Sequence, residues 1–508
     1  MSPPWWQTAV LYQVYPRSFL DTDGDGVGDL AGVRAKLPYL RWLGVDGVWL
    51  SPIYRSPMAD FGYDVSDHCA IDPVFGDLPG FDRLLADAHA IGLRLLLDWV
   101  PNHTSDRHPW FVESRSSRDS PKRDWYFWRD GHDGGPPNNW RAAFGGQAWT
   151  WDESTRQWYL HLFLSQQPDL RWSEPDVVDA MHGVLRFWLD RGVDGFRADV
   201  VHLISKDEEL PDQPPELADI DLVGVHDHPG AHPLLRDLRA VLDAYPGDRV
   251  MVGEVNLGSA ARLAPYYGAG DELHMVFNFS LLWAPWDAAH WAGRIAESEA
   301  ALAPSGAWPV WVLSNHDTPR HRTRYGSEAR ARVAATVLLT LRGTPFLYAG
   351  EELGLADAEV PDGVRVDPGG RDGCRAPFPW DDQAGHGWAG EPWLPWPPDP
   401  AVRNAGALAG DRRSILHLYR RLLACRRRSA ALHSGTWERL DAPDGVLAYE
   451  RRAGADVRRI WANFGDEAVA GDAGGDWVVE VVGSGRGEGD PWDGRLAATE
   501  ALVVRPVG

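Results

Sequence analysis

Acidic side chains stand directly after several short apolar runs of the 508-residue sequence. Asp199, Glu254 and Asp317 each follow such a run. Two carboxyl groups, one a nucleophile and one a proton donor, are the usual means of cleaving a glycosidic bond, and a third carboxylate can stabilise the transition state. Other polar residues share these run ends: Asp98, Asn102 and His103; Arg197 and His202; Asn256; and Asn315 with His316. The pattern therefore predicts one site with the chemistry of glycoside hydrolysis.

Each position taken alone has a simpler structural interpretation. Asp98 could cap the helix that follows it, and His316 could form a hydrogen-bonded pair with Asp317. Because four separate run ends carry such residues, a shared site is the favoured interpretation.

The elements that must position these residues alternate along the chain. Helix-like periodicity appears at 81–92, 181–192, 232–245 and 329–343. The apolar runs between such stretches lie at 9–16, 45–52, 93–101, 193–201, 249–255, 274–279, 310–317 and 344–352. Alternation indicates parallel strands with helical crossovers, and eight rounds predict a closed (β/α)8 TIM barrel of the α/β class. A long open doubly wound sheet is the alternative. In a barrel, the carboxyl ends of the strands gather the polar residues at one mouth.

Two stretches depart from this alternation. Residues 104–170, after the third strand, are rich in Trp, Asp, Gly and Pro, which predicts a subdomain inserted on that loop. Residues 431–508 alternate short apolar runs with turns, which predicts a small C-terminal all-β domain, a β-sandwich. The barrel itself would then comprise residues 1–103 and 171–430.

Composition restricts the partners. A formal net charge of -23 argues against nucleic acid or an anionic membrane and leaves neutral or cationic ligands open, among which sugars would fit. The 27 tryptophans have flat faces that suit sugar C–H surfaces, although packing would account for most of them.

The compartment is predicted from cysteines and apolar segments. Cys69, Cys374 and Cys425 lie far apart and form no disulfide framework. The N-terminal stretch MSPPWWQTAVLYQVYP lacks a basic segment followed by an apolar run, and no stretch approaches the ~20 apolar residues of a membrane span. We therefore expect a soluble cytoplasmic protein with no membrane partner.

Residues 21–30, DTDGDGVGDL, place Asp21, Asp23 and Asp25 at alternate positions before Gly26. This matches the first half of an EF-hand loop, but the twelfth loop position is Gly32 in place of a bidentate Glu. A divalent-cation loop without EF-hand helices is favoured over a phosphate cradle, because interleaved carboxylates repel an anion. A hydrated Asp-Gly turn is the simpler alternative.

Four segments resemble the signature regions of the α-amylase superfamily, glycoside hydrolase family 13: DWVPNHTS (98–105), GFRADVVH (195–202), GEVN (253–256) and LSNHD (313–317). Others are similar to its oligo-1,6-glucosidase and α-glucosidase (maltase) branch: YQVYPRSF (12–19), FGYDVSDH (61–68), QPDL (167–170) and RDGCRAPFPW (371–380). The resemblance runs from about residue 5 to about residue 430. It implies a retaining, exo-acting α-glucosidase for maltose, isomaltose and short oligosaccharides, without an organic cofactor.

The resemblance also implies residue roles. Asp199 would be the nucleophile, Glu254 the general acid/base, and Asp317 the carboxylate that binds sugar hydroxyls and stabilises the transition state. Arg197, two residues before Asp199, would keep the nucleophile ionised. The pocket for the first glucose would comprise Asp60, Tyr63, His103, Phe163, Gln167, His316 and one or both of Arg371 and Arg375.

The same branch carries a loop similar to DTDGDGVGDL that binds a structural calcium or magnesium ion. The resemblance maps the ligands to the side chains of Asp21, Asp23, Asp25 and Asp29 and to the backbone carbonyl of Val27.

Three positions leave the linkage preference open, and two of them differ from the usual residues of the branch. Val200 is typical of α-1,6 enzymes of the branch, but actinobacterial maltases that prefer α-1,4 bonds carry it too. Arg171 replaces the Asn of the usual QPDLN, and Ala376 stands where RTP is common.

Two other functions compete with hydrolysis. One is a transglycosylase or isomerase similar to trehalose synthase, which DWVPNHTSDRHPWF also fits. The other, less favoured because all three carboxylates are present, is a non-catalytic member similar to the transporter-associated heavy chains.

Overall fold

The centre of the molecule is a closed barrel of eight parallel strands. The computed structural model describes residues 3–222, 226–471, 474–485 and 487–507. Around the barrel the strand order is β1-β13-β12-β11-β10-β9-β5-β2. These strands are β1 (Leu11–Val14), β2 (Gly47–Leu50), β5 (Arg94–Trp99), β9 (Gly195–Ala198), β10 (Val250–Gly253), β11 (Met275–Asn278), β12 (Val310–Val312) and β13 (Thr344–Tyr348). Each lies within one of the eight apolar runs, so the predicted barrel is confirmed and the open-sheet alternative is wrong.

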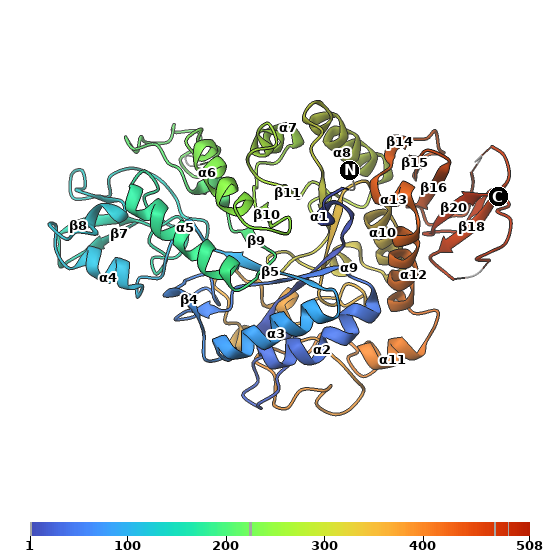
Figure 1. The fold of residues 1–508 in the computed structure, drawn as a ribbon, viewed down its shortest axis with the longest axis horizontal. Helices are drawn as coiled ribbons and strands as arrows, with labels where there is room; N and C mark the ends of the chain where they lie inside the picture. The colour runs from blue at the N-terminus through green and yellow to red at the C-terminus, as the bar shows by residue number, and fades with distance from the viewer. Residues whose placement is uncertain (1–2, 223–225, 472–473, 486, 508) are drawn as a thin grey trace.

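Helices cover the outside of the barrel (Figure 1). The longer ones are α2 (Leu30–Leu43), α3 (Leu78–Ala90), α5 (Pro175–Asp190), α6 (Ala231–Asp243), α8 (Ala288–Leu302), α10 (Glu328–Thr340) and α12 (Ile415–Arg428). Shorter ones are α1 (Trp5–Thr8), α7 (Ala260–Leu263), α9 (His321–Tyr325), α11 (Ala405–Gly410) and α13 (Ala430–Ser434). The four predicted helices are present, but α5 begins six residues earlier than expected, because Pro175 is favourable at the first helical position.

Local signals fix the ends of α2, which follows the acidic loop. The Asp29 side chain accepts a hydrogen bond from the backbone N–H of Gly32 and so caps the helix start. Gly44 ends the helix with a left-handed φ of 109°.

The interior of the barrel is filled by side chains, so it forms a packed floor under the mouth. Trp49, Leu96, Val250, Phe277 and Phe346 belong to one buried cluster within it. Trp49 connects this floor to the mouth, because its indole N–H donates a hydrogen bond to Asp98 at 3.2 Å.

A subdomain is inserted between β5 and β9, as predicted. It contains α4 (Pro109–Arg115) and an antiparallel sheet of β6 (Trp128–Arg129), β8 (Gln157–Leu160) and β7 (Trp149–Asp152). Its base is fastened to the barrel by the buried Lys206 ammonium group, which lies 2.9 Å from Asp169 and 3.0 Å from Asn102. A further hairpin, β3 (Tyr54–Arg55) with β4 (Asp67–Ile71), follows β2.

The C-terminal region is all-β. A five-stranded antiparallel sheet has the order β14 (Thr436–Arg439), β15 (Val446–Ala453), β16 (Asp456–Asn463), β20 (Ala501–Pro506) and β18 (Trp477–Val482), and a small second sheet pairs β17 (Val469–Ala470) with β19 (Arg495–Leu496). In Figure 1 this region and the inserted subdomain lie at opposite ends of the molecule. The C-terminal sheet packs on the barrel through α10, where the Tyr449 and Thr340 hydroxyls are 2.5 Å apart. Among the described residues, no helix has the length and apolarity needed to cross a bilayer.

Candidate active site

Three carboxylates surround the Arg197 guanidinium group at the mouth of the barrel. Arg197 on β9 lies 2.8 Å from Asp98, which belongs to β5, and 2.6 Å from Asp199. Its second terminal nitrogen donates to Glu254, which follows β10. Neighbouring parallel strands bring these residues level, because Asp98 pairs directly with Arg197 in the barrel register. Asp98 therefore joins the site and is not a helix cap.

The charge of this cluster is unbalanced, since three carboxylates face one guanidinium group. Burial raises the pKa of Asp199 well above its ordinary value, and Glu254 and Asp98 add to the effect while Arg197 opposes it. Burial likewise raises the pKa of Asp98 to about 6. The cluster therefore takes up a proton at a higher pH than an isolated Asp carboxylate would.

Asp317 lies in a different electrostatic environment across the mouth. The guanidinium groups of Arg371 and Arg375 lie 2.9 Å and 3.1 Å from its carboxylate. Burial alone would raise the pKa of Asp317, but His316, once its ring is protonated in acid, and these two arginines hold it well below its ordinary value. Asp317 is therefore ionised throughout the neutral range.

Arg371 and Arg375 are held by a further carboxylate, Asp367. Asp367 has a fully buried side chain and accepts from Arg371 at 2.6 Å and from Arg375 at 3.0 Å. Arg371 also reaches Asp60 at 2.6 Å, so it links Asp60, Asp317 and Asp367. Sequence reasoning missed Asp367, because the loop around it carries no motif.

A chain of neutral hydrogen-bonding groups runs behind the carboxylates. Burial lowers the pKa of His316 to about 3, so its ring is uncharged. The Gln13 side chain lies 2.7 Å from His316 Nδ1, and His316 Nε2 lies 2.6 Å from the Tyr63 hydroxyl. Tyr63 in turn donates to Asp98 at 3.1 Å. With Gln13 donating to Nδ1, the proton is on Nε2, and all donors in the chain point toward Asp98.

Val200 has a strained backbone next to Asp199. Its φ of 34° and ψ of 41° are left-handed, which a β-branched residue rarely adopts. In this conformation the Val200 N–H donates to Glu254 at 3.2 Å. The turn thus binds the Glu254 carboxyl group to the backbone amide that directly follows Asp199.

The carboxylates open into a cavity of about 210 Å³, here called the glucose cavity after the sugar that the sequence resemblance predicts for it. Nine of the predicted residues line it: Asp60, Tyr63, His103, Phe163, Asp199, Val200, Glu254, Asp317 and Arg371. Four others lie behind this wall and position it: Gln167, Arg197, His316 and Arg375. Gln167, for example, donates to Asp60 at 3.1 Å and lies 3.1 Å from His103.

Further lining residues were not selected from the sequence as pocket residues. Phe144 comes from the inserted subdomain, where the Arg371 guanidinium group lies 5.2 Å from its ring. His202 and Asn256 follow β9 and β10. Arg171, the departure from QPDLN, instead pairs with Glu208 at 2.9 Å and does not line the glucose cavity.

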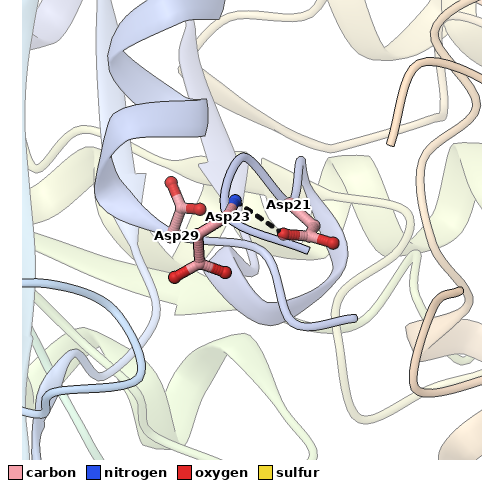
Figure 2. Close-up of side chains that lie close together, drawn as sticks. All are labelled: Asp21, Asp23 and Asp29. Carbon is pink, nitrogen blue, oxygen red and sulfur yellow. Dashed lines mark hydrogen bonds between the residues drawn. The ribbon is translucent and has the colours of Figure 1, made fainter. Parts of the chain in front are cut away.

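The acidic loop before α2 forms a separate cluster. One carboxylate oxygen from each of Asp21, Asp23 and Asp29 lies within 4.8 Å of the others (Figure 2). Asp21 is buried and accepts from the backbone N–H groups of Gly24 at 2.8 Å and Asp23 at 3.0 Å. Asp25 stands outside this trio and accepts from the Val27 N–H at 2.8 Å. Converging carboxylate oxygens are the donors that calcium and magnesium prefer.

The protein is a (β/α)8 barrel with carboxylates and buried arginines at its mouth, and the pKa is raised for some of these carboxylates and lowered for another. This is the architecture of a glycoside hydrolase. The chain belongs to the α-amylase family, because the family model described as alpha amylase, catalytic domain, matches residues 13–435. The protein is therefore an enzyme of the glycoside hydrolase class, and the non-catalytic alternative is not retained.

Relatives of known name cover nearly the whole chain. A probable alpha-glucosidase of Rhizobium meliloti (strain 1021) is 43% identical over 500 residues, spanning 92% of this chain and 90% of that protein. An oligo-1,6-glucosidase of Parageobacillus thermoglucosidasius is 38% identical, spanning 92% of each. The crystal structure of the alpha-glucosyl transfer enzyme XgtA superposes with a TM-score of 0.92 at 41% identity, covering 100% of both chains.

Replacing Asp367 by Asn should detach both arginines from their shared carboxylate. Because breaking a buried ion pair costs about 3–5 kcal/mol, we expect a fall of several degrees in the melting temperature and weaker substrate binding through Arg371. Differential scanning fluorimetry and KM measure the two effects. Asp362→Asn is the matched control, since the Asp362 side chain is 92% exposed on the same loop. Equal melting temperatures for the two variants would contradict this role.

Proposed function

We propose that the enzyme is a retaining, exo-acting α-glucosidase. It would release terminal non-reducing α-linked glucose from maltose, isomaltose and short oligosaccharides. The observation that carries the proposal is the pairing of Asp199 with Glu254 through Arg197, with the ionised Asp317 across the same cavity. The names of the two glucosidase relatives support it.

The reaction would proceed by double displacement. The Asp199 carboxylate attacks the anomeric carbon while Glu254 protonates the departing glycosidic oxygen, so one C–O bond forms as the other breaks. Glu254, now ionised, then removes a proton from water, which attacks the glucosyl-Asp199 ester and frees glucose as the α-anomer. Asp317 stabilises the positive charge that develops on the sugar ring.

Arg197 serves both steps because it contacts both reacting carboxyl groups. When Asp199 becomes a neutral ester, Glu254 becomes a carboxylate, so the total charge around the guanidinium group is unchanged. Arg197 therefore stabilises the negative charge on either partner without moving.

Exo-action is inferred from the salt bridges at the end of the glucose cavity. Arg371 joins Asp60 to Asp317 and closes the wall beside the first sugar. Such a wall admits a chain end and blocks the interior of a polymer. The linkage stays open between α-1,4 and α-1,6, and the cytoplasmic location stays a prediction.

A second candidate is glucosyl transfer. The similarity to XgtA favours it, because a glucosyl-enzyme intermediate is released by a sugar hydroxyl as readily as by water when an acceptor is bound. An isomerase similar to trehalose synthase would use the same intermediate. Products formed at high maltose concentration distinguish these cases. Glucose as the sole product indicates hydrolysis, a trisaccharide with an equal amount of glucose indicates transfer, and trehalose indicates isomerisation.

Replacing Asp199 by Asn should lower kcat by at least about a thousandfold, because the variant lacks the nucleophile. For the wild-type enzyme, NMR of fresh product should show α-glucose before mutarotation. Undiminished activity of the variant, or initial β-glucose, would overturn the proposal.

The raised pKa values predict early loss of activity in acid. Because burial raises the pKa of Asp199 and brings that of Asp98 to about 6, these carboxylates gain protons as the pH falls through this region. The nucleophile must be ionised, so kcat/KM should decline well above pH ~3.9, where an ordinary Asp titrates. A kcat/KM profile that stays flat down to pH 4, with circular dichroism confirming the fold, would contradict this expectation.

We further propose that the acidic loop holds a structural calcium or magnesium ion through Asp21, Asp23, Asp25, Asp29 and the Val27 carbonyl. The ion would supply positive charge that holds this first barrel loop in its fold and would take no part in bond cleavage. The converging oxygens of Asp21, Asp23 and Asp29 support this set.

Chelation should therefore lower the melting temperature while leaving KM nearly unchanged. The measurement compares thermal unfolding with excess EDTA and after addition of Ca²⁺ or Mg²⁺. Asp23→Asn removes one of the carboxylate ligands, at an exposed position. Added Ca²⁺ or Mg²⁺ should then restore less of the melting temperature that EDTA lowers. An unchanged melting temperature after chelation would count against a bound ion.

A further inference from the structure

A second cavity of about 290 Å³ lies at the mouth of the barrel beside the glucose cavity. Its walls are the segment after β10, the segment after β11 and the first turns of α8. The residues that matter here are Asn256, Ser280, Trp283, His290 and Arg294. Its volume is near the lower end of the range of about 300–1,000 Å³ that is usual for small-ligand pockets.

The two cavities meet at Asn256, which lines both. Its side chain is exposed, and its amide forms no hydrogen bond with the part of the chain that the structure describes. A free amide at the junction can donate to one ligand hydroxyl group and accept from another. A chain that leaves the glucose cavity on this side therefore meets a hydrogen-bonding group before it enters the second cavity.

Trp283 gives the second cavity an exposed aromatic face. Its exposed fraction is 61%, against 37% for each of Trp42 and Trp151, and no other described tryptophan is classed as exposed. Trp42 is covered by the Arg420 guanidinium group at 3.9 Å, and Trp151 packs on Trp158 at 5.6 Å. Within the described residues, no ring or cation stacks on Trp283, so its face is open to a ligand.

The remaining groups of the second cavity suit an uncharged polyhydroxy ligand. The Ser280 hydroxyl has no hydrogen-bond partner among the described residues. Arg294 is already paired with Glu297 at 2.9 Å, and no carboxylate lines the cavity. A flat apolar surface next to free hydroxyl and amide groups matches a sugar ring, which presents C–H groups on its faces and hydroxyls at its edge.

We propose that the second cavity binds the third glucose unit of an oligosaccharide, with Trp283 as its stacking platform. The inference rests on the proposed function, which places the first unit beside Asp199. The second unit then lies at the junction by Asn256, and the third reaches Trp283. The enzyme would thus recognise three-unit substrates better than two-unit ones.

The test compares Trp283→Ala with wild type on maltose, maltotriose, isomaltose and isomaltotriose. We expect kcat/KM for the preferred three-unit substrate to fall about tenfold, mainly through KM, while the value for the two-unit substrate of the same linkage stays within about twofold. Trp151→Ala, which removes an exposed tryptophan from the inserted subdomain, is the matched control and should leave all four values unchanged.

Direct binding separates this inference from the proposed function. Calorimetric titration of three-unit sugars into Asp199→Asn protein, with and without Trp283→Ala, should show the same loss without any turnover. If wild type cleaves the two-unit sugars but Trp283→Ala changes neither binding nor length preference, the inference is overturned and the function stands. If Trp283→Ala lowers activity equally on both lengths, Trp283 does not form a third-unit site. If wild type cleaves none of the four sugars, the proposed function itself fails.

Discussion

The site depends on one constraint: the positive charge of Arg197 can be buried in the barrel mouth only if carboxylates surround it. Asp98, Asp199 and Glu254 meet this need from three neighbouring strands, β5, β9 and β10. Because they outnumber the charge they neutralise and are buried, the pKa values of Asp199 and Asp98 are raised. Burying a single ion pair would be costly. Here the buried charges also place the proposed acid, Glu254, and the proposed nucleophile, Asp199, in one cluster.

Across the mouth the charges are closer to balance, because two arginines face three carboxylates: Asp317, Asp60 and the buried Asp367. The two sides differ in protonation because they differ in the ratio of carboxylates to guanidinium groups, although every group is an ordinary Asp, Glu or Arg. The chain of hydrogen bonds from Gln13 through His316 and Tyr63 lies between the two sides. It orients the Asp98 carboxyl group and carries no charge at neutral pH. The electrostatics of the site are therefore set in part by residues that do not line the cavity, among them Asp98, Arg197, Asp367 and Arg375.

Most of the barrel could be predicted from the sequence because parallel strands covered by helices are apolar along their length, and their polar residues are confined to the ends. This is why Asp199, Glu254 and Asp317 were recognised. Asp367 and Gln13 were missed for different reasons. Asp367 sits in a loop of turn residues without a motif, although its partners Arg371 and Arg375 are near in sequence. Gln13 is a polar residue inside a buried strand, and its partner His316 is distant in sequence. The second cavity could not be predicted either, since it arises where two separate loops and a helix meet.

The strained backbone at Val200 has a consequence for the divergence of such enzymes. The Val200 side chain lines the glucose cavity, and the Val200 backbone amide donates to Glu254. One position therefore affects both the shape of the cavity and the placement of Glu254. Exchange of Val200 for Ala or Thr would alter the shape of the cavity that this side chain lines. Glycine would relieve the strain and loosen the acid at the same time. Position 200 therefore couples the shape of the cavity to the placement of Glu254.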